Sequence, residues 1–302
     1  MSNKAMAIDE FCKELGRRVV FIRDICEQFK VPLKPDQGLT LALNEAEALS
    51  VGKKSKDPLT PLRLNEAVRC AHVVYAIAES LETCAKVGLD VSDHLRQMTT
   101  GTANYGTPGS YEARTIFLKD FEFELFVASA LIRGGIIPEF FPQSNDPRGD
   151  MFVGQIFIEC KHPNSVGQLE TLLRKFNAAL RRASRFGVFA IAVEDAFNLG
   201  DRDEFATQVE FDFWLEAKRV KMETEGLALA KRAAKLHRIA SIVYTSSFVE
   251  IVAGGSSMRR LSNSIIFDHR ETFEKYAATA GQIAKVFNPV PGLSSALKLG
   301  RT

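Results

Sequence analysis

Two carboxylates and a lysine fall within one short stretch of the sequence, at a spacing that could bind a metal ion. Asp150 begins this stretch, Glu159 and Lys161 end it, and an apolar run lies on each side of Gly154-Gln155. Glycine at the first central position favours a two-residue hairpin turn. With that turn Val153 faces Ile156, and counting back along both strands places Asp150 directly opposite Glu159.

The alternation of side chains along the two predicted strands separates a chemical face from an apolar face. Successive residues of a strand point to opposite sides of the sheet. One face would therefore carry Asp150, Phe152, Phe157, Glu159 and Lys161. The other face would be wholly apolar and would point into a core, with Met151, Val153, Ile156, Ile158 and Cys160.

The predicted pairing of the two carboxylates is unfavourable unless a cation is present. Carboxylates opposed on neighbouring strands lie about 5 Å apart at Cβ and repel each other. A divalent cation reverses the sign, because hard oxygen ligands at this separation can share one Mg²⁺. Lys161 could orient a water molecule there, or stabilise negative charge on a phosphate. A bulge or a longer turn would change the partner of Asp150, but Glu159 and Lys161 would still share a face.

The part of the chain before this stretch is predicted to be helical. Apolar residues recur at three- and four-residue spacing across 11–29 and again across 64–85. The segment 99–110 has three glycines, a proline and many hydroxyls without an apolar period, which is typical of a linker. We therefore predict a helical N-terminal region over 1–110, for recognition, assembly or regulation, and a second domain over 111–302.

Strand and helix patterns alternate after the linker. Helices are predicted over 113–133, 165–185, 203–237 and 271–287. Strands are predicted over 136–141, 150–153, 156–161, 188–193, 239–244 and 264–267. Strands interleaved with helices around one sheet predict an α/β or mixed α+β fold.

Length and composition fit two globular domains and exclude several protein classes. The chain has 302 residues, a net charge of +2 and a hydrophobic fraction of 46%. These values exclude a histone-like or a strongly acidic protein. The apolar runs are far shorter than the ~20 residues of a membrane helix, and the N-terminus has no apolar signal core. Five scattered cysteines without CxxC spacing predict reduced thiols of a cytoplasmic protein.

The residues of the acidic stretch resemble a known signature. Asp150…Glu159-Cys160-Lys161 is similar to the D…(D/E)xK motif of the PD-(D/E)xK, or restriction-endonuclease-like, nucleases. The resemblance extends to the helix that carries Glu124, to the helix 165–185 and to the strand 188–193. It covers roughly residues 115–195 and implies an αβββαβ core with a mixed sheet. The helical N-terminal region lies outside it.

The resemblance implies a role for each site residue. Asp150 and Glu159 would be metal ligands, with the backbone carbonyl of Cys160 as a third. Lys161 would position or activate the attacking water, and Glu124 would bind a second metal or a metal-bound water. The implied cofactor is Mg²⁺ or Mn²⁺, and the implied reaction is hydrolysis of a phosphodiester by in-line attack.

Three features depart from the pattern of the family. Gly149 stands where the signature has proline. One subgroup requires a tyrosine four residues after Gln168, and a leucine stands there, so only a contact of Gln168 with the site stays open. Glu122 competes with Glu124, and we favour Glu124 because the apolar residues after it fit the expected pattern.

Basic residues follow the motif. Between Glu170 and Glu194 there is no acid, while five cations are present, Arg174, Lys175, Arg181, Arg182 and Arg185. Such a stripe could contact a phosphate backbone, and a solvated helix face is an equally good interpretation. A second basic group could simply be a favourable helix C-terminus, with Lys231, Arg232, Lys235, His237 and Arg238. His162 could assist the metal or a phosphate, and a loop histidine at a strand end is the alternative.

The sequence therefore predicts a Mg²⁺-dependent endonuclease in the cytoplasm, with no membrane contact. Its substrate would be nucleic acid, with DNA favoured over RNA, and a homodimer would suit the cutting of two strands. A helical region before a nuclease domain is compatible with a restriction or phage-defence effector. The alternative is a catalytically inactive module of the same fold, which binds nucleic acid or has a structural role.

Overall fold

We analysed a computed structural model of the chain. It describes residues 8–34, 38–51, 61–99, 116–141, 149–199, 204–252, 255–267 and 274–288. The chain divides into two compact units, each described here by itself. The first unit contains residues 1–126, 201–211 and 248–259, and the second contains 127–200, 212–247 and 260–302.

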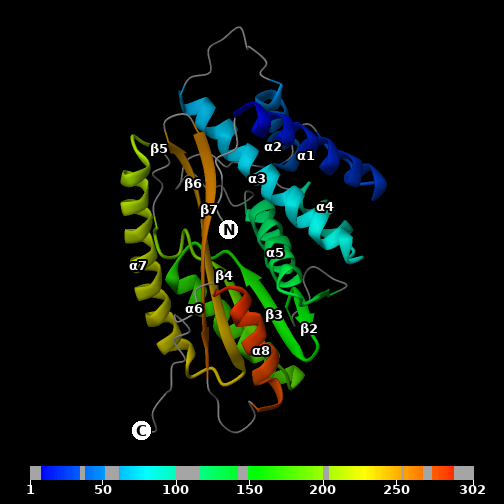
Figure 1. Cartoon of the computed structure of the whole chain (residues 1–302). Coiled ribbons are helices and arrows are strands. Elements are labelled where there is room, and N and C mark those ends of the chain that lie inside the picture. The colour runs from blue at the N-terminus through cyan, green and yellow to red at the C-terminus, as the bar shows by residue number, and fades with distance from the viewer. Residues whose placement is uncertain are drawn as a thin grey trace. The chain divides into compact units, whose positions relative to one another are not determined.

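The first unit is built mainly from helices. These are α1 (Ile8–Gln28), α2 (Gly38–Ser50), α3 (Pro61–Lys86), α4 (Ser92–Met98) and the beginning of α5 (Ile116–Arg133). The helices α1, α2 and α3 pack against one another, as the blue and cyan ribbons of Figure 1 show. Their core contains Leu15, Ile22, Leu43, Ile77 and Leu81, all fully buried. The predicted helices over 11–29 and 64–85 are confirmed by α1 and α3.

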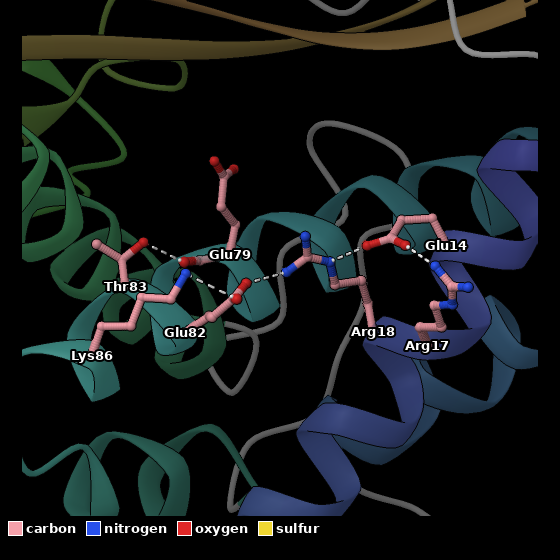
Figure 2. A network of polar contacts seen from close by, with 7 residues as sticks. All are labelled: Glu14, Arg17, Arg18, Glu79, Glu82, Thr83 and Lys86. Carbon is pink, nitrogen blue, oxygen red and sulfur yellow. Dashed lines mark hydrogen bonds and ion pairs between the residues drawn. The ribbon is translucent and has the colours of Figure 1, made fainter.

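A charged network ties α1 to α3 at the surface of this helical core (Figure 2). The Arg18 guanidinium lies 2.9 Å from Glu14 within α1 and 2.7 Å from Glu82 in α3. Lys86 lies 3.0 Å from the second oxygen of Glu82. Arg18 also stacks over the ring of Tyr75, at 5.0 Å from its centroid. The guanidinium therefore contacts both an anion and an aromatic face, which fixes α1 along α3.

The second unit is built around a mixed β-sheet. Its strands are β1 (Glu139–Phe140), β2 (Met151–Val153), β3 (Ile156–Lys161), β4 (Phe186–Ala192), and most of β6 (Ile239–Val252) and β7 (Gly255–Ile266). The order is β1-β2-β3-β4-β6, with β7 paired to β6. The pairs β1–β2 and β2–β3 are antiparallel, whereas β3–β4 and β4–β6 are parallel. The predicted α/β class with a mixed sheet is confirmed.

Helices cover both faces of this sheet. Gly187 and Phe189 of β4 face α6 (Val166–Ala183), since the Phe176 ring contacts both. The alternate residue Phe186 instead stacks on Tyr276 of α8 (Glu274–Val286). Figure 1 shows α6 and α8 on opposite sides of the strands. All seven residues of β4 are buried, as expected for a parallel strand covered on both faces.

The helix α7 (Gln208–Ala233) lies on the same face as α6. Its Gly226 lies against the ring of Tyr244, and Tyr244 pairs with Ile191 in the sheet. Paired residues of parallel strands point to the same side, and Ile191 is on the side of Phe189. The helices α6 and α7 therefore lie on one face of the sheet, and α8 lies on the other.

Several predicted boundaries were wrong. The predicted strand 136–141 forms only the two-residue β1, and the predicted helix 203–237 begins at Gln208, after the short strand β5 (Glu204–Phe205). The strand β6 continues well past 244, and β7 takes up residues that we did not predict as a strand. Serine-rich segments of β6 and β7 lack the apolar alternation that would have indicated them. The helices α2 and α4 were also not predicted.

The predicted linker 99–110 lies outside the described residues, apart from Thr99. The domain boundary placed there stays a prediction. The described elements that follow run in the order α5-β1-β2-β3-α6-β4.

The substitution Gly187→Ala should destabilise the second unit. A Cβ at this position would lie 2.6 Å from the Phe176 ring and 2.9 Å from Leu180. Overpacking of this kind costs about 1–3 kcal/mol of the free energy of unfolding. Urea denaturation followed by the fluorescence of Trp214, the single tryptophan, measures the change.

A glycine with open space around it serves as the control for this substitution. Gly281 lies within α8, and an added Cβ would meet no atom within 4 Å. Gly281→Ala should therefore raise the free energy of unfolding by about 0.5–1 kcal/mol, because alanine is the better helix former. Equal effects of the two substitutions would contradict the described packing of β4 on α6.

Candidate functional site

The hairpin formed by β2 and β3 has the predicted register. Val153 pairs with Ile156, Phe152 with Phe157 and Met151 with Ile158. The Asp150 N–H donates at 2.9 Å to the carbonyl of Ile158, the residue that already pairs with Met151, so the ladder is irregular here and Asp150 is not paired with Glu159. Gly154 begins the turn with φ +56°, a conformation that favours glycine. The predicted register is confirmed for the three pairs from Met151 to Val153, whereas the predicted direct pairing of Asp150 with Glu159 is not formed.

Asp150, Glu159 and Lys161 meet at the end of this hairpin. The Asp150 carboxylate accepts a hydrogen bond from the Cys160 N–H at 2.6 Å and lies 3.3 Å from the Lys161 ammonium. The same ammonium lies 2.9 Å from the Glu159 carboxylate. Exposure of the three side chains is 6% for Asp150, 17% for Glu159 and 30% for Lys161. One cation therefore bridges two largely buried carboxylates.

Burial raises the pKa of both acids, and repulsion by Asp150 adds to the shift of Glu159. Desolvation raises the pKa of Asp150, although the positive charge of Lys161 and the hydrogen bond from Cys160 act in the opposite direction. Desolvation, and then the negative charge of Asp150, raise the pKa of Glu159 to about 7. Both shifts mean that negative charge at this place is only partly compensated by one ammonium group.

Gly149 gives the chain the conformation it needs just before Asp150. Its φ is +130°, and an added Cβ would lie 2.7 Å from the Ile158 carbonyl oxygen. Proline has φ fixed near −65°, so the proline of the family signature could not occupy this backbone conformation. The departure at Gly149 is thus tied to the way the chain enters the hairpin.

The donor set suits a hard divalent cation. Two carboxylates are available, and the Cys160 carbonyl points toward the β2 side of β3, because the N–H of the same residue does so. Mg²⁺ commonly takes one or two protein carboxylates and completes its shell with water and substrate phosphates. Among the described residues, no group of three or more His, Cys, Asp or Glu side chains is placed to hold a metal. Asp150 and Glu159 would therefore supply two ligands of such an ion, and water or substrate oxygens would complete its shell.

Glu124 lies in a different environment from the other predicted site residues. It belongs to the first unit, where its carboxylate lies 3.0 Å from Nε2 of His94. Both side chains are 9% exposed, and desolvation lowers the pKa of His94 to about 4. Glu122 is half-buried on the same helix. A contribution of Glu124 to the site of Asp150 stays a prediction.

The predicted basic stripe extends along α6 and away from the acidic site. Arg174, Lys175, Arg181 and Arg182 are exposed. Arg185, which follows the helix, donates to the side chain of Gln155 in the hairpin turn. Gln155 lies four residues before Glu159 along the chain, and each residue of an extended strand advances about 3.3 Å. The stripe therefore ends at a turn about 13 Å from Glu159, at about 3.3 Å per residue.

Gln168 has a structural role at the start of α6. Its side-chain oxygen accepts a hydrogen bond from the Asn164 N–H at 2.7 Å, and its own N–H donates to the Ser165 hydroxyl at 3.2 Å. Ser165 is the N-cap residue, and the pattern differs from a capping box in that Gln168 accepts from the residue before the cap; both bonds satisfy backbone donors at the helix N-terminus. The oxygen of Gln168 is thus engaged in capping α6.

His162 belongs to a second polar cluster that the sequence analysis missed. Its Nε2 lies 3.4 Å from Asp195 and 3.8 Å from Glu194, two residues that directly follow β4. Glu194 also accepts a hydrogen bond from the Ser247 N–H at 2.7 Å. His162 directly follows the end of β3, which agrees with a loop histidine at a strand end, and its imidazole is 9% exposed. Acids directly after an apolar strand, at the carboxyl edge of a parallel sheet, were the available signal.

Comparison with known proteins completes the description of the site. The chain has no significant match to any family model, curated protein or solved structure. In the described part of the chain, no helix is long and apolar enough to cross a lipid bilayer. The chemistry of the site therefore has to be argued from its own residues.

In the metal-free protein, the free energy of unfolding should fall as the pH rises from about 4.5 to about 7. The pKa of Glu159 is 4.5 as a free side chain and about 7 in the folded protein. The folded state therefore holds this proton more tightly, and its advantage is complete below pH 4.5 and is lost as the carboxyl ionises. With about 1.4 kcal/mol per pKa unit, the loss should be roughly 3–4 kcal/mol.

Urea denaturation in the presence of a chelator, across this pH range, measures the loss. Glu159→Gln cannot ionise and should remove most of the dependence. Glu216→Gln, which alters an exposed acid of α7, should keep the wild-type slope. A slope unchanged by Glu159→Gln would contradict the assigned shift.

Proposed function

We propose that the protein is a metal-dependent nuclease that hydrolyses phosphodiester bonds of nucleic acid. The observation that carries the proposal is the convergence of two largely buried carboxylates on one ammonium group, since Lys161 lies 3.3 Å from Asp150 and 2.9 Å from Glu159. A purely structural sheet gains nothing from two buried acids at one place. A cation-dependent site requires them.

Asp150 and Glu159 would hold the metal, Mg²⁺ or Mn²⁺, with the Cys160 carbonyl as a further oxygen donor. Such an ion supplies a Lewis acid for the phosphate and lowers the pKa of a bound water. The hydrogen bond from the Cys160 N–H fixes one oxygen of Asp150, so this carboxylate is oriented before any ligand arrives. A preoriented carboxylate avoids reorganisation during the reaction.

Lys161 would orient the attacking water and stabilise charge on the phosphate. Its side chain is the most exposed of the three and has room to move when a divalent ion takes its place between the carboxylates. The ammonium would then lie beside the ion, within reach of a water or a phosphate oxygen. A positively charged group in this position stabilises the negative charge that develops in the transition state of phosphoryl transfer.

The order of the elements supports the same function. The succession α5-β1-β2-β3-α6-β4 agrees with the αβββαβ order expected of a restriction-endonuclease-like core. The exposed cations of α6 would contact phosphates outside the cleaved bond. We favour DNA as the substrate on the basis of the resemblance alone, and a homodimer or a defence role has the same basis.

Substitution of the site residues should abolish cleavage. Asp150→Asn removes a metal ligand and Lys161→Ala removes the ammonium, and each should lower the rate by at least about 100-fold. The assay incubates the purified protein with plasmid and linear DNA, and with single-stranded RNA, with Mg²⁺ or with a chelator. Glu216→Gln, on the exposed face of α7, should cut like wild type.

Wild-type activity in both site variants would show that the assigned residues are not catalytic, or that a contaminating nuclease cuts the substrate. DNA binding without cleavage in the wild type would favour the alternative, a binding module of the same fold. Binding and cleavage are therefore both measured on each variant.

Magnesium should stabilise the folded protein through the same two carboxylates. A ligand that binds only the folded state, at 100 times its Kd, raises the free energy of unfolding by about 2.7 kcal/mol. Calorimetric titration gives the Kd, and urea denaturation with and without Mg²⁺ gives the stabilisation. The double variant Asp150→Asn, Glu159→Gln should lose both signals. Equal stabilisation of wild type and double variant would place the metal elsewhere.

A further inference from the structure

A groove between α6 and the end of α7 gathers positive charge at a distance in sequence from the acidic site. It has a volume of about 350 Å³ and lies within the second unit. Its lining contains four cations and one acid, Arg174, Lys231, Arg232, Lys235 and Glu170. Leu173, Ala233 and Leu236 complete the lining. Since a water molecule takes about 30 Å³, the groove has room for about ten waters, or for a phosphate group with several waters.

The cations of the groove come from two helices far apart in the sequence. Arg174 lies in the middle of α6, whereas Lys231 and Arg232 lie in the last turn of α7 and Lys235 follows it. Glu170 joins the two helices, because its carboxylate lies 3.6 Å from Arg174 and also accepts a hydrogen bond from Arg232. One carboxylate thus holds two guanidinium groups at the groove and leaves an excess of three positive charges.

The two lysines of the groove are available to an anion. Both are exposed, and in the part of the chain that the structure describes neither Lys231 nor Lys235 makes an ion pair. Cations at a helix C-terminus are favoured by the helix dipole, which could explain the residues of α7 alone. That effect does not explain why Arg174, from the middle of another helix, lies at the same groove. Convergence of four cations around a hollow is what an anion site requires.

We propose that this groove binds phosphate groups. Guanidinium groups held in place by Glu170 can donate paired hydrogen bonds to phosphate oxygens, and the lysines add mobile positive charge. The phosphate could come from a nucleic acid backbone or from a free nucleotide, and the chemistry of recognition is the same. If the ligand is a nucleic acid backbone, the groove would bind a second phosphate of the nuclease substrate. This part of the proposal rests on the proposed nuclease function.

Two probes test the groove in the presence of a chelator, so that cleavage plays no part. Inorganic pyrophosphate represents a free phosphate ligand, and a fluorescein-labelled 20-base-pair DNA duplex represents a backbone. The double variant Lys231→Gln, Lys235→Gln should raise the Kd about tenfold for any probe that binds in the groove. For the duplex, the slope of log K against log salt should become smaller by about 2, because about 0.9 counterion is released per phosphate contact.

A charge-matched control and a variant of opposite sign complete the design. Lys13→Gln with Lys34→Gln removes the same charge from exposed positions of the first unit and should bind both probes like wild type. Glu170→Gln removes the internal anion of the groove and should tighten binding severalfold. If these cations only interact with the helix dipole and bind no ligand, neither the double lysine variant nor Glu170→Gln should change the binding of either probe.

The outcomes distinguish the two possible sources of the phosphate, and they distinguish the groove from the acidic site at Asp150. Loss of duplex binding alone assigns the groove to a nucleic acid backbone, loss of pyrophosphate binding alone assigns it to a free phosphate ligand, and loss of both supports binding of either. Wild-type binding of both probes by the double lysine variant would overturn the proposal. Asp150→Asn should leave pyrophosphate binding in the groove unchanged, so failure of the nuclease proposal and failure of the groove are distinguishable.

Discussion

The antiparallel pairing of β2 with β3 is the constraint on which the candidate site depends. A two-residue turn at Gly154 fixes the register, and the end of the hairpin brings the carboxylates of Asp150 and Glu159 to the same Lys161 ammonium. The fold thereby holds two buried carboxylates together, against their mutual repulsion and their desolvation. The Lys161 ammonium offsets part of this cost, and the raised pKa of Glu159 shows that it does not offset all of it. A divalent ion would supply the remaining charge.

The parallel pairing of β3 with β4 places the polar residues of the hairpin at the carboxyl ends of these two strands. In this register Glu159 pairs with Phe189 and Lys161 with Ile191, so the polar residues of β3 lie beside apolar residues of β4 that α6 covers. Apolar neighbours on one side keep the carboxylates poorly solvated, and the strand end keeps Lys161 partly exposed. The same sheet therefore provides both the low polarity that strengthens charge interactions and an access route for solvent.

The sequence was sufficient for the features that depend on local rules. The register of the hairpin followed from Gly154 and from the alternation of side chains, and the fully buried β4 followed from an uninterrupted apolar run. Features that depend on tertiary contacts were not predicted. Lys231 and Lys235 gave no sign that they would meet Arg174, and the serine-rich part of β6 is a strand because β7 pairs with β6. Glu194 and His162 come together only because their strands are neighbours.

The carboxylates and the exposed cations of the second unit lie on different elements. The carboxylates lie near the carboxyl end of β3, whereas the stripe on α6 reaches the hairpin turn, about 13 Å from Glu159 at about 3.3 Å per residue. Cations directly beside the carboxylates would compete with a metal, as Lys161 does in its absence. Cations on α6 and α7 can instead neutralise phosphates of a bound polyanion without occupying the metal position. A net charge of +2 for the whole chain is thus compatible with strong local fields of both signs.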